Sequence, residues 1–415
     1  MRKHKADYFI VLTTLALMAA GLVMMFMIGP QRANFLNSAL GYEKYSENFF
    51  FSRQLISVGV SIVAFIVAAK LPIKILHKYA KWILFLALGL NALLAILAAI
   101  NSPLAVCQLG GCRWIGTAGV SFQPAELLKV ALVIYLADLM ARRKEERKLE
   151  SFADFWWPYI LVCGASLFFV VVLQKDLGTG VALVAIMLAT LFISGVPLRY
   201  FAAAVGVVLA AGIMSIVISP HRMERLSTFN GAGDSDSSYH IDNALLAIGT
   251  GGLLGVGVGN SVQATGYLPE SVNDSIFAMI GEAFGFLGTT ILMLAFMFLL
   301  MRLLKMIPLL DTEKGIMVAG IFAWIFAQVI VNVAAMTGLV PLTGITLPLL
   351  SYGGTSMMFV AFALGSALQI SSFTARRSAS SEDALLTRRT FSTSRSGAPS
   401  SSHSIHAEKL RGGER

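Results

Sequence analysis

The sequence predicts an all-α fold, a polytopic helical bundle embedded in a membrane. Of the 415 residues, 56% are hydrophobic and only 13% are charged, and the mean hydropathy is +0.74. A bilayer core about 30 Å thick needs roughly 20 apolar residues per helical span, and stretches of that length recur along the chain. A membrane β-barrel would instead show short segments of alternating hydrophobicity. The composition therefore excludes a water-soluble domain and favours spanning helices.

Ten apolar stretches are predicted to span the membrane. They run approximately over residues 8–29, 54–70, 80–100, 125–141, 156–174, 178–194, 199–219, 275–302, 314–337 and 351–372. The first stretch has no small-residue cleavage site, so we expect a retained helix rather than a removed signal peptide. An even number of spans places both termini on one side.

The distribution of Lys and Arg predicts which side is cytoplasmic, because cytoplasmic loops carry an excess of them. With a cytoplasmic N-terminus, the inner segments hold 24 of the 32 Lys and Arg residues, and 16 when the C-terminal tail is left out. Both termini are therefore expected in the cytoplasm. The net charge of +9 is explained by topology and by attraction to anionic lipid, and nucleic acid is not an expected partner.

The longest connection, about residues 220–274, lies on the expected outer side and includes the apolar, glycine-rich stretch 243–259. We predict that this stretch is a re-entrant or surface-lying element lining a cavity, since irregular backbone in lipid must be covered by protein or water. Its glycines favour close helix packing over nucleotide binding. From about residue 374 the chain becomes rich in Ser, Thr and Arg, which predicts a transmembrane domain over 1–374 and a disordered cytoplasmic tail over 375–415.

The cysteines and histidines of the sequence indicate neither a definite disulfide nor a metal site. Cys107 and Cys112 lie on the expected outer side, where a disulfide is chemically possible but closes only a short loop. Their redox state stays open. The six histidines are scattered and form no transition-metal pattern.

Ionisable residues beside or inside the spans predict a polar cavity that opens outward, because a charge at membrane depth is expensive and usually marks a site. Asp274 and Glu282 are eight residues apart, so they should share one helix face. Ion pairs that hold the bundle together are the alternative explanation. The ionisable residues concerned are Arg113, Glu126, Lys129, Asp176, Glu270, Asp274 and Glu282, with Arg222 and Arg225 in the long loop.

Five segments resemble, in order and spacing, signature segments of the SEDS family of shape, elongation, division and sporulation proteins. The resemblance covers about residues 5–374 and implies ten spans with a large extracytoplasmic loop between spans seven and eight. It also implies a peptidoglycan glycosyltransferase that polymerises lipid II, an undecaprenyl-diphosphate-linked substrate, into glycan strands at the outer face of the cytoplasmic membrane. The segments are 113–129, 174–180, 243–263, 267–288 and 338–357.

The resemblance assigns the essential carboxylate of the family to Asp274. As a general base it would accept the proton of a sugar hydroxyl, which attacks the anomeric carbon of a second substrate and displaces the lipid diphosphate with inversion. The charge of the diphosphate would be neutralised by outer cations, and a divalent ion such as Mg²⁺ could share that work; no other cofactor is expected. The expected cations are Arg113, Lys129, Arg222 and Arg225.

Further substrate-binding residues follow from the charge pattern and the resemblance together. Trp114 could stack on lipid or sugar, or anchor the chain at the interface. Asp176 begins an expected helix, where a carboxylate also caps backbone amides. For the positions that match the family's central cavity, packing roles are equally open. The remaining residues are Gln123, Glu126, Glu270, Glu282, Ser351 and Tyr352.

Residues 260–270 resemble the division-type FtsW members more than the elongation-type RodA members. This implies a role at the division septum, with a class B penicillin-binding protein transpeptidase and other divisome proteins as partners. Departures from the family pattern, such as Ser275 directly after Asp274, indicate a divergent lineage. The alternatives are a lipid II flippase, a RodA-like polymerase and a catalytically silent scaffold. A flippase needs a polar path through both leaflets, whereas the polar residues here concentrate on the outer side.

Overall fold

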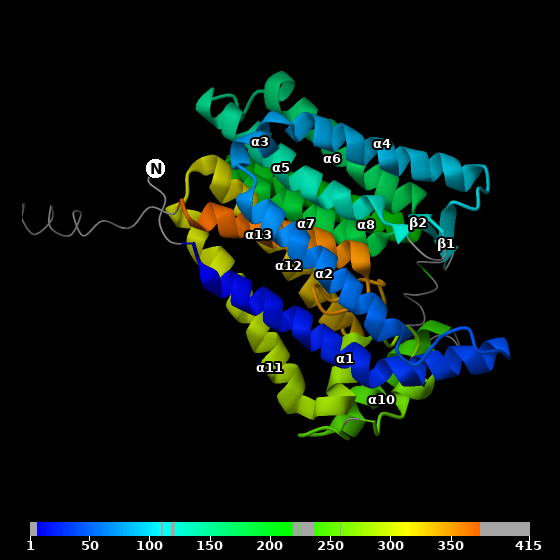
Figure 1. Cartoon of the computed structure of the whole chain (residues 1–415). Coiled ribbons are helices and arrows are strands. Elements are labelled where there is room, and N and C mark those ends of the chain that lie inside the picture. The colour runs from blue at the N-terminus through cyan, green and yellow to red at the C-terminus, as the bar shows by residue number, and fades with distance from the viewer. Residues whose placement is uncertain are drawn as a thin grey trace, which may run out of the picture. The chain divides into compact units, whose positions relative to one another are not determined.

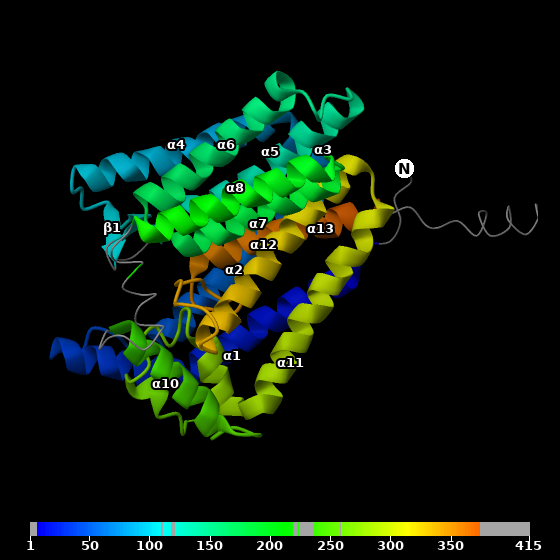
Figure 2. The same cartoon turned by 180° about the vertical axis from the view of Figure 1, so that it is seen from behind.

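The computed structural model describes residues 6–108, 111–117, 121–218, 223, 236–257 and 259–373. In this part, the small sheet and α10 lie at one end of the helices, and the α11–α12 connection lies at the other (Figure 1). The view from behind shows the same arrangement (Figure 2). The longer helices are α1 (Tyr8–Leu40), α2 (Phe49–Lys70), α4 (Ala80–Ala99), α5 (Pro124–Glu145), α6 (Trp157–Leu167), α7 (Leu177–Ser194), α8 (Leu198–Val217), α10 (Asp236–Gly251), α11 (Ile276–Met306), α12 (Thr312–Met336) and α13 (Gly354–Ser371).

Shorter elements connect these helices. Two π-helical turns, Phe152–Trp156 and Phe168–Leu173, extend α6 at its two ends. The other short elements are α3 (Ile73–Lys78), the 3₁₀ turns Gln263–Thr265 and Ile307–Leu309, and the strands β1 (Ala105–Gln108), β2 (Gly111–Gly116) and β3 (Ser121–Phe122).

All ten predicted spans are helical. Within the described residues, nine helices are long and apolar enough to cross a membrane. The tenth, α5, carries several charges, yet Glu126, Lys129 and Asp138 are each at most 5% exposed. Because α5 faces other helices and not lipid over most of its surface, it needs no apolar surface all round. The all-α membrane bundle is therefore confirmed.

Helix α1 is longer than predicted, since it continues through Pro30 to Leu40 instead of ending near residue 29. Gly41 stops it in the left-handed conformation. The side chain of Asn37 then accepts hydrogen bonds from the backbone N–H groups of Lys44 and Tyr45. The hydrophobic stretch ends at Pro30, but local capping, which hydropathy does not reveal, ends the helix.

The strands form a small antiparallel sheet in the order β1-β2-β3 that the sequence did not predict. Cys107 and Cys112 are paired across β1 and β2 and form a disulfide. The sequence left the redox state of these two cysteines open, and in the structure they are oxidised to a disulfide.

Both ends of the described chain lie together. The backbone N–H of Asp7 donates to Ser371 Oγ at 2.9 Å, and Arg302 forms an ion pair with the Asp7 carboxylate. The start of α1 and the end of α13 are therefore neighbours, as an even number of spans predicts.

Glycines let α10 and the following turn approach α11 closely. A Cβ added at Gly251 would lie 1.8 Å from the carbonyl oxygen of Gly281. Helix α11 is interrupted at Gly285 (φ 65°, ψ −160°), and the freed backbone groups bond to the turn: Phe286 N to Gly252 O at 2.8 Å, and Val256 N to Glu282 O at 2.9 Å. The predicted close packing of the glycine-rich stretch is confirmed. Backbone groups of residues 252–257 are paired with α11, and irregular backbone within a membrane needs such pairing.

We predict that Gly251→Ala lowers the thermal unfolding midpoint of the detergent-purified protein, because the new methyl group meets fixed backbone. Overpacking of this kind costs about 1–3 kcal/mol. Gly249→Ala is the matched control on the same helix, since nothing lies within 4 Å of its added Cβ. Fluorescence-monitored melting should show a lower midpoint for Gly251→Ala alone, and equal midpoints for the two variants would contradict the close approach.

Candidate active site

Asp274 lies just before α11 and is only 8% exposed. Its backbone is held from α12 by Asn332, whose Nδ2 donates to the carbonyl oxygens of Asp274 and Ile345, both at 2.7 Å. Asn332 itself is 1% exposed. One buried amide therefore ties the carboxylate-bearing turn to the loop between α12 and α13.

The residue after Asp274 is clamped by α10. Ser275 Oγ donates to the carbonyl oxygen of Pro269 at 2.9 Å and lies 2.6 Å from His240 Nε2. A serine hydroxyl has one proton, and the carbonyl takes it, so the imidazole Nε2–H is the donor to Ser275. Helix α10 therefore holds the turn at Ser275, in addition to the bond from Asn332 on α12.

Sequence reasoning missed His240 and Asn332. Asn332 did carry a signal, because a polar side chain inside an apolar span usually has a buried partner. Nothing in the local pattern identified the turn before α11 as that partner.

The loop between α12 and α13 brings Ser351 and Tyr352 to the same turn. Tyr352 N donates to the carbonyl oxygen of Val272 at 2.9 Å, and its ring lies edge-on to Phe50 at 5.4 Å. Ser351 Oγ accepts a hydrogen bond from Leu347 N at 2.8 Å. The structure thus brings Ser351 and Tyr352 close to the turn of Asp274. The contacts observed for Ser351 and Tyr352 are structural contacts within the protein.

A second group forms around the start of α7. The Asp176 carboxylate caps α7 by accepting from Thr179 N at 3.0 Å, which agrees with the predicted capping role. Gln123 Nε2 donates to Asp176 Oδ2 at 3.4 Å, and Arg113 Nε lies 4.0 Å from the same oxygen. Arg113 also donates to the carbonyl oxygen of Lys175. Trp114, next to Arg113 on β2, is half-buried.

The loop between α12 and α13 joins the two groups. A Cβ on Gly344 would lie 3.7 Å from Arg113 Nη1, and the next residue, Ile345, offers the carbonyl that Asn332 binds together with that of Asp274. The guanidinium of Arg113 and the turn of Asp274 therefore border one short loop.

Glu126 and Lys129 form an ion pair inside the bundle. Lys129 Nζ lies 2.8 Å from Glu126 Oε1 and 4.7 Å from the centre of the Trp324 ring. Lys129 is fully buried, so its charge is satisfied by these two contacts. Among the described residues, Glu126 Oε2 has no hydrogen-bond partner. This geometry favours the bundle-holding alternative for Lys129 over direct contact with a diphosphate.

The two other acidic side chains serve nearby turns. Glu282 accepts hydrogen bonds from Ser261 Oγ, Val262 N and Gln263 N. Glu270 accepts a hydrogen bond from the Asn273 side chain. Their substrate contacts remain predictions, as do those of Arg222 and Arg225, which lie outside the described residues.

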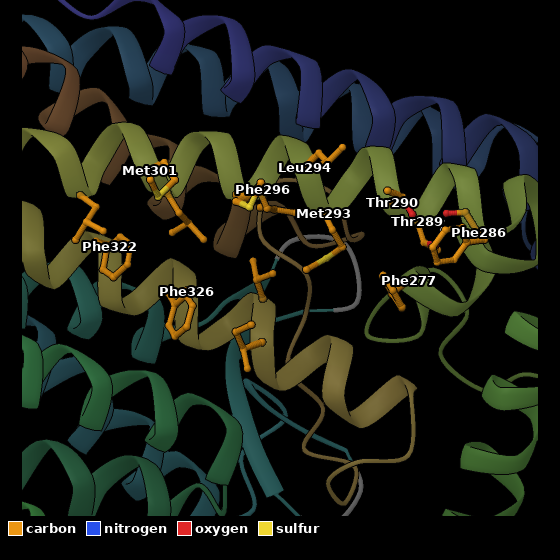
Figure 3. A pocket seen from close by; sticks show the side chains of 15 residues that line it. Phe277, Phe286, Thr289, Thr290, Met293, Leu294, Phe296, Met301, Phe322 and Phe326 are labelled. Atoms are coloured by element: carbon orange, nitrogen blue, oxygen red, sulfur yellow. Dashed lines mark hydrogen bonds between the residues drawn. The ribbon is translucent and has the colours of Figure 1, made fainter.

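An apolar groove of about 570 Å³ runs between α11 and α12. Phenylalanine side chains from both helices and methionine side chains from α11 point into it, and Thr289 and Thr290 supply the hydroxyl groups at one end (Figure 3). Phe277, which is three residues after Asp274, lines the same end. The groove is thus an apolar, largely aromatic surface that reaches the first turn of α11.

The donor set limits which metal could act at Asp274. Among the described residues, no group of three His, Cys, Asp or Glu side chains includes Asp274. Mg²⁺ commonly uses one or two protein carboxylates together with phosphate oxygens. The residues present therefore fit Mg²⁺ that arrives with a diphosphate better than an ion held by the protein alone.

The sequence of the chain is similar to those of known proteins. The family model for cell cycle proteins of the FtsW, RodA and SpoVE type matches residues 8–376. Stage V sporulation protein E of Bacillus subtilis is 30% identical over 377 residues, covering 90% of this chain and 98% of that protein. The probable peptidoglycan glycosyltransferase FtsW of Coxiella burnetii is 33% identical over 370 residues, covering 88% and 95%.

Two solved structures share the fold. A chain from a study of the structural coordination of polymerization and crosslinking by a peptidoglycan synthase complex has a TM-score of 0.68 at 21% identity, covering 88% of this chain and 97% of that chain. The rod shape determining protein RodA of Thermus thermophilus has a TM-score of 0.61 at 22% identity, covering 88% and 96%.

We predict that Asn332→Leu destabilises the protein, because it keeps the volume but leaves the carbonyl groups of Asp274 and Ile345 unpaired. A buried unpaired polar group costs about 1–3 kcal/mol. Asn243→Leu is the control, since Asn243 makes one exposed hydrogen bond to Tyr239 O on α10 and should change stability by no more than about 0.5 kcal/mol. Denaturation in detergent compares the two variants, and equal losses would refute the bridging role.

Proposed function

Because the chain belongs to the FtsW, RodA and SpoVE family, the SEDS proteins, we propose that it is a peptidoglycan glycosyltransferase that polymerises lipid II at the outer face of the cytoplasmic membrane. Relatives that it matches over most of their length are named as such enzymes. The observation that carries the proposal is Asp274, a nearly buried carboxylate whose turn is held by α10, α12 and the loop before α13.

The proposed reaction needs one base and one anion site. Asp274 accepts the proton of the attacking sugar hydroxyl, the new glycosidic bond forms with inversion at the anomeric carbon, and the lipid diphosphate leaves. A base held on a rigid turn is effective because its carboxylate stays in line with the hydroxyl. The hydrogen bonds from Asn332 to the carbonyl of Asp274 and from Ser275 to the carbonyl of Pro269 supply that rigidity.

Arg113 is the described cation best placed to meet the leaving diphosphate. It borders the loop that Asn332 ties to Asp274, and its side chain is 17% exposed, so it reaches solvent. Its fork of N–H donors suits phosphate oxygens. Arg222 and Arg225 remain candidates for the same charge, with Mg²⁺ as a shared counter-ion.

We further propose the division type within the family, acting at the septum with a class B penicillin-binding transpeptidase. Residues 260–270 and the FtsW names of several relatives support this choice. A related fold occurs in a peptidoglycan synthase complex of coordinated polymerization and crosslinking. We also propose that both termini lie in the cytoplasm, which the distribution of Lys and Arg supports.

We predict that Asp274→Asn lowers glycan-strand formation from purified lipid II by about 10²- to 10⁴-fold, the usual contribution of a general base. The assay uses the full chain co-purified with its transpeptidase partner. Asp242→Asn is the control, because Asp242 is an exposed carboxylate on α10 and should leave the rate unchanged.

Each alternative makes a different prediction for the same assay. Polymer that persists in Asp274→Asn refutes the assigned base. Absence of polymer in the wild type, together with Asp274-dependent lipid II transfer across vesicle membranes, supports the flippase, and absence of both supports the scaffold.

We also predict that Arg113→Ala slows polymerisation by about 10²-fold, the typical loss when one donor to a developing charge is removed. Arg113→Lys should recover part of the rate, because it keeps the charge but not the fork. Arg32→Ala, which removes a cation stacked on Phe35, is the control. If Arg113→Ala polymerises at the wild-type rate, the guanidinium does not meet the diphosphate.

A further inference from the structure

Three potential metal ligands meet at the end of the helices that lies away from Asp274. His77 comes from α3, Asp138 from α5 and Glu313 from the first turn of α12. Their ligand atoms all lie within 4.8 Å of one another, and His77 Nδ1 is 3.0 Å from Glu313 Oε1. Sequence reasoning found no metal pattern, because these residues are far apart along the chain.

The imidazole of His77 is nine-tenths buried, and its close contact with Glu313 is not a hydrogen bond of good geometry. Among the described residues, neither ring nitrogen makes a hydrogen bond of good geometry. A buried polar group without a hydrogen bond is costly and calls for an explanation. Because one ligand atom of the ring and one of each carboxylate lie within 4.8 Å of one another, a cation among them would satisfy all three side chains.

The charges of the three side chains agree with this role. An imidazole binds a metal ion through a ring nitrogen in its neutral form. One neutral imidazole and two carboxylates carry a charge of −2, which a divalent ion neutralises.

We propose that His77, Asp138 and Glu313 bind a divalent transition-metal ion, with Zn²⁺ as the best match. Zinc accepts imidazole nitrogen and carboxylate oxygen together, and three protein ligands leave one position for water. Asp138 is 5% exposed, so the site is shielded from bulk solvent on that side. The site is independent of the glycosyltransferase assignment.

Two cationic side chains, Arg142 and Lys314, lie near the three ligands and should lower the affinity for a metal ion. Arg142 contacts Asp138, but its side chain is 52% exposed and can turn into solvent, which frees the carboxylate. Lys314 is paired with Asp311. Since zinc must displace Arg142 from Asp138, we expect weaker binding than in a closed structural site.

A bound ion would link three segments. Helix α3 is only six residues long and connects α2 to α4, and the ion would fasten it to α5 and α12. Occupancy should therefore raise resistance to unfolding without any change at Asp274.

The test measures Zn²⁺ binding to the chelator-stripped, tag-free full chain in detergent, by calorimetric titration and by thermal melting at rising Zn²⁺. We expect one ion per chain and a melting midpoint that rises with Zn²⁺ concentration. His77→Ala, Asp138→Asn and Glu313→Gln should each weaken binding at least about tenfold, since even outer partners of metal ligands contribute 10–100-fold.

Two controls separate this site from adventitious binding. Glu150→Gln removes an exposed carboxylate paired with Arg199, and His403→Ala with His406→Ala removes the imidazoles of the tail. Both should bind Zn²⁺ like the wild type. The proposal is overturned if the wild type shows no saturable binding, if the ligand variants bind equally well, or if the tail variant loses the ion. Asp138→Asn keeps the side-chain volume and serves if His77→Ala fails to fold.

Discussion

The backbone pairing at the break in α11 is the constraint on which the rest of the site depends. In a membrane bundle every backbone N–H and C=O needs a partner, and the non-helical Gly285 interrupts the hydrogen bonds along α11. Residues 252–257 supply the missing partners, which fastens the end of α10 to α11. Glu282, one turn earlier, binds the turn at residues 261–263. The segment that leads to Asp274 is thus attached to α11 twice before it enters the helix.

The fold was largely predictable because the bilayer restricts the possibilities. A span needs about 20 residues that can leave water, so hydropathy located the helices of all ten predicted spans, α5 with its buried charges included, but neither the short α3 nor α10. The ends of the helices were harder, because caps decide them: Asp176 caps α7, whereas α1 runs past Pro30 until Gly41 stops it. The small sheet was missed, since strands of two to six residues leave no clear pattern. Its disulfide depends on the strand pairing that brings Cys107 opposite Cys112.

The candidate site was predictable as a set of residues but not as a set of contacts. Resemblance and charge pointed to Asp274 and Arg113. The spacing of Asp274 and Glu282 suggested a shared face, yet the partners of Glu282 lie about 20 residues earlier in the chain. Polar side chains inside apolar spans behave similarly: Gln174 donates to Asn91 at 2.6 Å, and Gln54 donates to the carbonyls of Leu350 and Ser351. A sequence signals that such a residue needs a partner, but only the packing of helices identifies it.

Helix α12 connects the two polar centres of the molecule. Asn332 near its end holds the backbone of Asp274, and Glu313 in its first turn faces His77. The two residues are 19 positions apart, about 28 Å along a straight helix. Between them α12 packs against α5, α7 and α11, with Trp324 fully buried under Lys129. The contacts of α12 with α5, α7 and α11 hold Asn332 in place along the length of the helix. Because protein interiors are close-packed, this packing is enough to fix the backbone of Asp274, whether or not an ion binds among His77, Asp138 and Glu313.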